Sequence, residues 1–335
     1  MQRKLCGTIG KVVYMDISVI IPVYNRANMI TNALDSLKNQ TISNFDVIIV
    51  DDGSYDNLQK VISEYANELN IKYIHLSHSG NIAFLRNCGL KASNSKYIAI
   101  LDSDDWCFPE RLEKQFNFMN KNENIDILSS WIILNDEFQD ENTKRLEWLY
   151  NMNGDENEII IRCLNDGCCI CNSTVMMKKS RIDELGGYDE RMHICEDFNL
   201  WLRAILNHYD IKIMKEKLVV RKLHKQSVTE GYNGAATSIR LVIKNKIEYL
   251  KATFKLEGEI YIWGINSRNS ILLDELKAVI DNENMIHIID IYNEMPGGKI
   301  NKNAYHLVTT FSRRDDVFEY LKNQGLKIVE NFIYA

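Results

Sequence analysis

Short apolar runs alternate with helix-forming segments along much of this 335-residue chain. The clearest runs are rich in Val and Ile and precede segments with helical spacing; they cover residues 17–23, 46–50, 72–76 and 97–101. Continuous apolar runs of this length are typical of strands that are buried on both faces. Strands of this kind that alternate with helices predict an α/β fold with a mostly parallel sheet.

The same pattern divides the chain into four parts. Residues 1–15 lack a clear period and are expected to form a leader, and the first domain then covers residues 16–230, although the pattern becomes less regular after about residue 121. Residues 231–257 are helical in pattern and are expected to connect two domains. Strands and helices alternate again from residue 258, so residues 258–335 are predicted to form a small Rossmann-like α/β domain.

Composition excludes several classes of function. Lys and Arg number 40 against 46 Asp and Glu, and the net charge of −6 offers no basic excess for nucleic acid. No apolar run approaches the roughly 20 residues that span a bilayer, and no signal peptide follows Met1. We therefore expect a cytoplasmic protein with reduced thiols, and peripheral attachment at the inner face of a membrane stays open.

Polar residues follow three of the predicted strands. The strand ends carry the sequences PVYNR at 22–26, DDGS at 51–54 and DSDD at 102–105. Turn formation and helix capping would explain one such terminus. Three that meet at the carboxyl edge of one sheet indicate a ligand site instead. The glycine-rich motif of P-loop nucleotide-binding proteins does not occur in the chain.

Asp102 and Asp104 are the strongest candidates for metal binding. In an extended segment, side chains at positions i and i+2 project to one side, so these two carboxylates can face one cation. Carboxylate oxygens suit Mg²⁺ or Mn²⁺, which proteins usually hold together with substrate phosphates. The pair therefore points to a substrate that contains a diphosphate.

Four motifs resemble the family 2 glycosyltransferases of the GT-A fold: SVIIPVYN at 18–25, VDDGS at 50–54, RNCG at 86–89 and YIAILDSDD at 97–105. The resemblance implies an inverting enzyme that moves one sugar from a nucleotide-diphosphate sugar, preferably a UDP-sugar, to an acceptor hydroxyl. It implies that Asp102 and Asp104 bind the metal. It also implies a set of residues that contact or support the nucleotide: Pro22, Tyr24, Asn25, Asp51, Asp52, Arg86 and Ser103.

Glu196 and Asp197 precede a predicted helix and are similar to the Glu-Asp segment of that family. A carboxylate there serves as general base, because the acceptor hydroxyl must lose its proton as it attacks. Asp197 is favoured over Glu196. The alternative is that the pair caps the helix and adds favourable charge at its N-terminus. The resemblance also implies that His224 completes metal or diphosphate binding, whereas an isolated histidine is more often structural or exposed.

Two further features have weaker functional implications. Cys163, Cys168, Cys169 and Cys171 lack the spacing of paired zinc knuckles and fit buried thiols equally well. The segment WGINSRN at 263–269 follows a strand and begins a helix, but it lacks the full dinucleotide-binding glycine pattern. We expect the C-terminal domain to be structural, to bind the acceptor or to form a homo-oligomer, rather than to bind NAD.

Two other functions fit the same residues: a nucleotidyltransferase, which would release pyrophosphate, and a non-catalytic nucleotide-sugar-binding scaffold. The sequence names neither the sugar nor the acceptor, which can be a glycan, a lipid-linked glycan or a protein. The Gln-x-x-Arg-Trp motif of processive synthases is absent from the chain, which favours a single addition. A role in bacterial surface glycan or glycoconjugate synthesis is expected from the resemblance.

Overall fold

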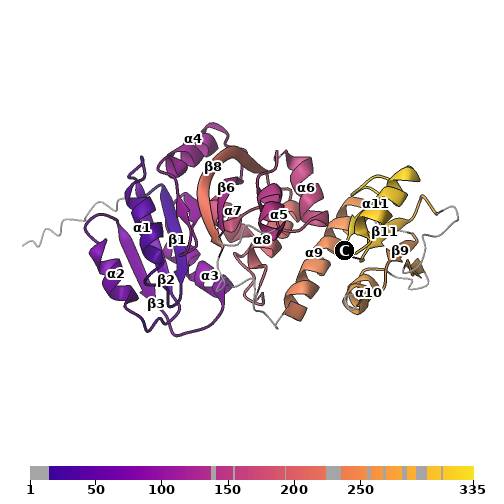
Figure 1. The fold of residues 1–335 in the computed structure, drawn as a ribbon, viewed down its shortest axis with the longest axis horizontal. Coiled ribbons are helices and arrows are strands. Elements are labelled where there is room, and N and C mark those ends of the chain that lie inside the picture. Colours follow the sequence, from indigo (N-terminus) through magenta and orange to yellow (C-terminus); the bar gives the residue numbers. More distant parts are fainter. Residues whose placement is uncertain are drawn as a thin grey trace, which may run out of the picture.

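The chain folds around two β-sheets, one of eight strands and one of four (Figure 1). The computed structural model describes residues 15–136, 141–153, 155–192, 194–223, 235–254, 258–266, 269–280, 285–291, 300–310 and 312–335. Residues 1–14 of the expected leader and His224 lie outside these ranges. Within them, every helix is too short or too polar to cross a membrane.

The parallel half of the large sheet confirms the predicted alternation. Its strands lie in the order β3-β2-β1-β4, and their bounds are β1 (Ile17–Val23), β2 (Phe45–Asp51), β3 (Ile71–His75) and β4 (Tyr97–Ile100). Every residue of β1 is buried, as expected of a central strand. The helices α1 (Ile30–Lys38) and α2 (Leu58–Glu64) pack on one face, and α3 (Ile82–Ala92) packs on the other.

The other half of this sheet is mixed. Next to β4, the order continues β7-β6-β8-β5, with β7 antiparallel to both neighbours and β6 parallel to β8. The strands are β5 (Trp106–Cys107), β6 (Ile127–Asp136), β7 (Met176–Lys178) and β8 (Ile211–Leu223). The helices are α4 (Arg111–Lys121), α5 (Glu141–Tyr150), α6 (Glu156–Asn165), the 3-10 turn η1 (Asn172–Thr174), α7 (Lys179–Glu184) and α8 (Glu196–Leu206).

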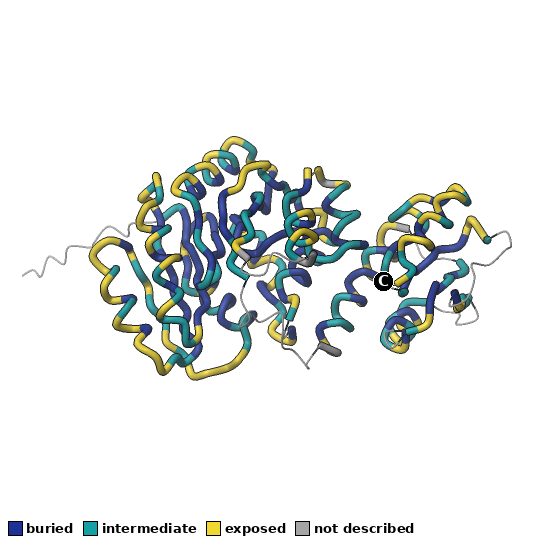
Figure 2. The backbone as a smooth tube through the Cα atoms, in the orientation of Figure 1, coloured by how far each residue is buried: buried dark blue, intermediate teal, exposed yellow. Residues whose placement is uncertain are grey.

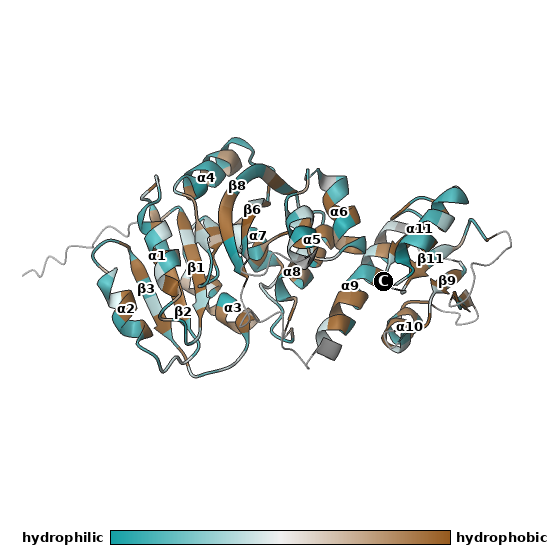
Figure 3. Cartoon of the chain, in the orientation of Figure 1, coloured by the Kyte–Doolittle hydropathy of each residue, from teal (hydrophilic) through white to brown (hydrophobic). Residues whose placement is uncertain are grey.

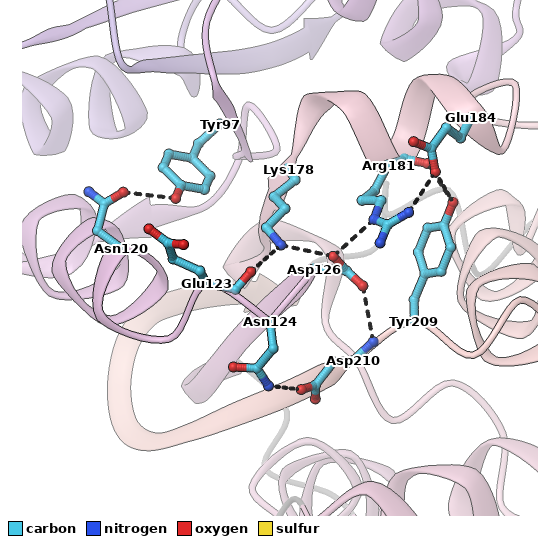
Figure 4. A network of polar contacts seen from close by, with 10 residues as sticks. All are labelled: Tyr97, Asn120, Glu123, Asn124, Asp126, Lys178, Arg181, Glu184, Tyr209 and Asp210. Carbon is cyan, nitrogen blue, oxygen red and sulfur yellow. Dashed lines mark hydrogen bonds and ion pairs between the residues drawn. The ribbon is translucent and has the colours of Figure 1, made fainter.

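A polar network holds the starting ends of β6 and β8 together (Figure 4). Asp126 precedes β6 and is buried, and its carboxylate accepts hydrogen bonds from Lys178 Nζ at 3.0 Å, Arg181 Nε at 3.2 Å and the Asp210 backbone nitrogen at 3.2 Å. A buried carboxylate needs such partners. The network lies at the edge of the sheet opposite the carboxyl ends of β1 and β4, so it stabilises the fold without contributing to the ligand edge.

The second sheet is wholly parallel, with the order β10-β9-β11-β12. It comprises β9 (Ile260–Trp263), α10 (Asn269–Lys277), β10 (Ile286–Ile289), β11 (Tyr305–Val308), α11 (Arg314–Asn323) and β12 (Phe332–Tyr334). In chain order this is 2-1-3-4, the flavodoxin-like arrangement of a doubly wound sheet, whereas the Rossmann order is 3-2-1-4. The α/β prediction for this region is therefore confirmed, and the strand order is the flavodoxin-like one.

Helix α9 (Ala235–Phe254) joins the two sheets through a shared core rather than as an exposed connector (Figure 2). It contacts both α8 and α10. Its buried residues Ile243, Ile247 and Leu250 belong to one hydrophobic cluster with residues of both sheets. The apolar stretches of the strands and of α9 are visible in Figure 3. Helix α9 and the second sheet are thus packed against the first domain.

Candidate functional site

The end of β2 holds two buried carboxylates. Asp51 accepts hydrogen bonds from the Ser54 backbone nitrogen at 2.9 Å, from Tyr73 Oη at 2.5 Å and from His75 Nδ1 at 2.7 Å. Burial acts to raise the pKa of Asp51, but these hydrogen bonds outweigh it and lower the pKa. The carboxylate is therefore ionised at neutral pH and fixed at the carboxyl edge of the sheet.

Asp52 holds the loop that follows β3. Its two oxygens accept from Ser79 N and Oγ at 2.8 and 2.7 Å and from Gly80 N at 2.8 Å. His78 of the same loop stacks on Tyr24 with ring centroids 4.1 Å apart, and Tyr24 is 36% exposed. Asp52 was predicted to contact the nucleotide. In the structure its oxygens bind the protein's own loop, which presents the aromatic pair.

The loop after β1 is bonded to the DDGS turn. Asn25 has a positive φ of 49°, its backbone nitrogen donates to Ser54 Oγ at 2.8 Å, and its side-chain oxygen accepts from Tyr55 N at 3.0 Å. Pro22 is a buried residue of β1 that pairs with Val50 of β2. The exposed edge of this region is therefore formed by the loop residues rather than by the proline.

The DSDD turn presents two of its three carboxylates to solvent. The side chains of Asp102 and Asp104 are 31% and 12% exposed, and Asp104 forms an ion pair with Arg26. Ser103 and Asp105 are buried. Burial, Asp104 and Asp102 together raise the pKa of Asp105 to about 8, and its carboxyl oxygen accepts from the Lys222 backbone nitrogen at 2.9 Å. Asp102 and Asp104 thus keep partial contact with solvent, while the buried Asp105 anchors the turn.

Arg86 links this turn to the start of α8. Its guanidinium is buried; Nη2 donates to Asp102 Oδ1 at 2.8 Å, and Nη1 donates to Glu196 Oε1. Burial alone would lower the pKa of Arg86, but Asp102 and Glu196 raise it. The arginine is permanently charged and neutralises two carboxylates. Its fully buried position, with both carboxylates already engaged, was not predicted from the sequence.

Asp197 is the less engaged member of the Glu-Asp pair. It is partly open to solvent and accepts from the Phe198 backbone nitrogen at 2.6 Å, whereas Glu196 is buried against Arg86. Burial is the main cause that raises the pKa of Asp197 to about 7, and the neighbouring Glu196 adds to it. A carboxylate with these surroundings is suited to accept a proton near neutral pH.

Arg221 and Tyr150 belong to the site but were not predicted as site residues. Arg221 Nη1 donates to Tyr150 Oη at 3.0 Å, and the positive charge of Arg221 acts on Asp102 and Asp105. The arginine comes from β8 and the tyrosine from the last position of α5. Arg221 and Lys222 directly follow Val219 and Val220, and this local pattern does not indicate that Arg221 reaches the DSDD turn.

The donor set suits a divalent cation held jointly with a substrate. Among the described residues, no three His, Cys, Asp or Glu side chains are grouped closely enough to hold a metal by themselves. Asp102 and Asp104 offer carboxylate oxygens on one turn, which is the share that a protein usually supplies to Mg²⁺ or Mn²⁺ when phosphates complete the coordination. The cysteines within the described residues are free thiols, and Cys163 and Cys169 lie buried with their sulfurs 3.5 Å apart.

Comparison with known proteins identifies related sequences. The profile described as "Glycosyl transferase family 2" matches residues 18–185. Uncharacterized glycosyltransferases of Methanocaldococcus jannaschii and Rickettsia bellii are 33% and 35% identical over 61% and 65% of this chain. The amylovoran biosynthesis glycosyltransferase AmsE of Erwinia amylovora is 27% identical over 73% of it. The chain spans 69%, 30% and 90% of the lengths of these three relatives, respectively.

Solved structures share the fold. Residues 1–349 of S. aureus TarS, in complex with UDP-GlcNAc, superpose with a TM-score of 0.60 at 22% identity, covering 78% of this chain and 72% of that one. The mannosyltransferase PcManGT of Pyrobaculum calidifontis, in complex with GDP-Man and Mn²⁺, gives 0.51 at 14% identity, covering 71% and 64%. At these identities the likeness concerns the fold alone.

Proposed function

Because this chain belongs to glycosyl transferase family 2, we propose that it transfers a single sugar from a nucleotide-diphosphate sugar to an acceptor hydroxyl. The observation that carries the proposal is the bridge made by Arg86. It joins Asp102 of the DSDD turn to Glu196, the residue next to Asp197. Such a reaction requires a turn that binds the diphosphate and a group that accepts a proton. Here the buried Arg86 contacts both the DSDD turn and the Glu-Asp pair.

The donor nucleotide would bind across the ends of β1 and β2. Asp51 is an ionised acceptor for a base N–H group, and the exposed Tyr24, stacked on His78, offers an aromatic face. We propose a UDP-sugar as donor. TarS, which shares the fold, was solved with UDP-GlcNAc and supports this choice.

Asp102 and Asp104 would hold Mn²⁺ or Mg²⁺ together with the donor diphosphate. When bound, the cation would stabilise the negative charge of the departing nucleoside diphosphate. The arginines add to the same task, since Arg26 and Arg221 bring positive charge to the DSDD turn. The Mn²⁺ in the PcManGT complex supports the assignment of a divalent metal.

Asp197 would accept the proton of the acceptor hydroxyl. As that oxygen forms its bond to the anomeric carbon, the bond from this carbon to the diphosphate oxygen breaks, and the electron pair leaves with the nucleoside diphosphate. One displacement of this kind inverts the anomeric configuration and needs no protein nucleophile. The acceptor is proposed to be a hydroxyl of a growing surface glycan, as the name of the related AmsE suggests.

A donor screen tests the proposal. Thermal unfolding is measured with UDP-, GDP-, CMP- and dTDP-sugars in Mn²⁺ or Mg²⁺ for the wild type, for Asp104→Asn and for Asp183→Asn, an exposed acidic control on α7. A donor at 100 times its Kd should stabilise the wild type and the control by about 2.7 kcal/mol, and the Asp104 variant far less. A folded wild type that no donor stabilises would contradict the proposal.

A further inference from the structure

The C-terminal sheet contacts the end of α6. Arg314 Nη2 is paired with Asp166 Oδ1 at 2.5 Å, and these two side chains are only 18% and 17% exposed. The Tyr334 backbone nitrogen donates to Asn165 Oδ1 at 2.9 Å, and the Tyr334 carbonyl accepts from Lys246 Nζ at 2.9 Å. Asn165 is the last residue of α6 and Asp166 is its C-cap. The last strand and α11 therefore hold the point at which α6 ends.

The segment that leaves this point runs directly to the proposed donor site. It is buried at Ile170 and ends in η1, where Ser173 Oγ accepts from the Asp102 backbone nitrogen at 3.2 Å. The neighbouring Asn172, with its amide oxygen facing Arg86, accepts from Arg86 Nη2 at 2.9 Å and Nε at 3.1 Å. Residues 166–174, which we call the α6–η1 segment, thus contact the C-terminal sheet at one end and both Asp102 and Arg86 at the other.

We infer that the C-terminal sheet positions the donor site through the α6–η1 segment. A short segment packed in a core transmits displacement because interiors are close-packed and have little free volume. Arg314 and Asp166 are positioning residues in this account. They contact no substrate and act by fixing the segment on which Asp102 and Arg86 rest. The effect on nucleotide binding rests on the proposed function, whereas the positioning is a property of the protein alone.

Asp166→Asn is the informative variant, because it removes the charge and keeps the shape. Arg240→Gln is the matched control. Arg240 pairs with Glu275 at 2.7 Å and Asp274 at 3.0 Å, so it also joins α10 of the C-terminal sheet to α9, yet neither acidic residue belongs to the α6–η1 segment. Arg314→Gln serves as a second variant on the other side of the pair. A merely stabilising ion pair would lower the Tm in all three.

Two measurements on the full chain distinguish the outcomes. Hydrogen–deuterium exchange without ligand should be about three- to tenfold faster across 168–174 in Asp166→Asn and Arg314→Gln than in the wild type or Arg240→Gln. Calorimetric titration with UDP and Mn²⁺ should show that Asp166→Asn and Arg314→Gln bind UDP about three- to tenfold more weakly than the wild type. Unchanged exchange across 168–174 in both variants would overturn the inference. A wild type that binds no UDP while exchange changes as expected would count against the proposed function and leave the positioning supported.

Discussion

Asp197 is the carboxyl group whose surroundings best suit a general base. Its side chain is partly exposed to solvent, and the neighbouring carboxylate of Glu196 is hydrogen-bonded to Arg86. Burial and Glu196 raise the pKa of Asp197 to about 7. Replacing it with Asn should lower turnover about 10²- to 10⁴-fold, because proton abstraction is lost. UDP affinity, measured by calorimetry in Mn²⁺, should stay within about threefold of the wild type. If Asp197→Asn keeps the turnover of the wild type, another group acts as the general base.

The raised pKa of Asp197 also predicts two pH dependences. Turnover should rise with pH up to about 7 and then level off, as the base loses its proton. For stability, the folded-state pKa exceeds the unfolded value, so the contribution of this group is present at low pH and is lost as pH rises through 7. Asp197→Asn should therefore raise the Tm by a few degrees at pH 8 and by less at pH 5. A gain that is larger at pH 5 would contradict the account.

Residue types and spacing were sufficient to single out the candidate carboxylates: Asp51 ends a strand, Asp102 and Asp104 follow one, and Asp197 lies in the first turn of a helix. Their roles in the reaction stay predictions. The arginines were harder to predict. Arg221 reaches the DSDD turn only because β8 lies next to β5, which is a tertiary pairing without a local signal. The internal engagement of Asp52 depends on the path of the loop after β3 and could not be predicted either.

At the scale of elements, α3 carries Arg86 and packs closely on the central strand β1. A Cβ atom added at Gly89 would lie 2.5 Å from Ile20 Cγ2, so Gly89→Ala should destabilise the protein by about 1–3 kcal/mol through overpacking. Urea unfolding measures the change. The matched double variant with Ile20→Ala, which removes the opposing atoms, should cost less than the sum of the two single changes. If the free-energy changes of the two single variants simply add in the double variant, the contact between Gly89 and Ile20 does not determine the position of α3.

The parallel half of the large sheet was predictable because β1, β2 and β4 are largely buried on both faces and consist mainly of Val, Ile and other apolar residues, while the edge strand β3 is partly exposed. The second half was not. In β8 lysines alternate with apolar residues before the run at 218–220, and β7 has only three residues, so neither stands out from a loop or a helix. Helices α5, α6 and α7 were also missed, because their short apolar faces contact neighbouring elements that the sequence does not identify.

At the scale of the whole molecule, the two sheets share one hydrophobic core through α9. The sequence predicted a helical connector over residues 231–257 and a second set of strands from residue 258, and α9, which lies within that connector, packs into the shared core. A chain ending at residue 257 would lack α10 and the second sheet, and it would expose Ile243, Ile247 and Leu250, which pack in the shared core. We expect it to lose cooperative unfolding or to aggregate, as measured by circular dichroism and light scattering. An unchanged Tm would show that the first domain folds independently.

Phosphorus NMR of the wild type with UDP-GlcNAc and Mg²⁺ identifies the bond that is cleaved, with GDP-mannose measured in parallel and with water as a slow acceptor. A sugar transferase cleaves the bond between the anomeric carbon and the diphosphate. Resonances of UDP or GDP should therefore accumulate with the wild type and should not accumulate with Asp197→Asn. Release of pyrophosphate from UTP or GTP with a sugar phosphate, without any release of nucleoside diphosphate from a sugar donor, would contradict the proposed function and identify a nucleotidyltransferase.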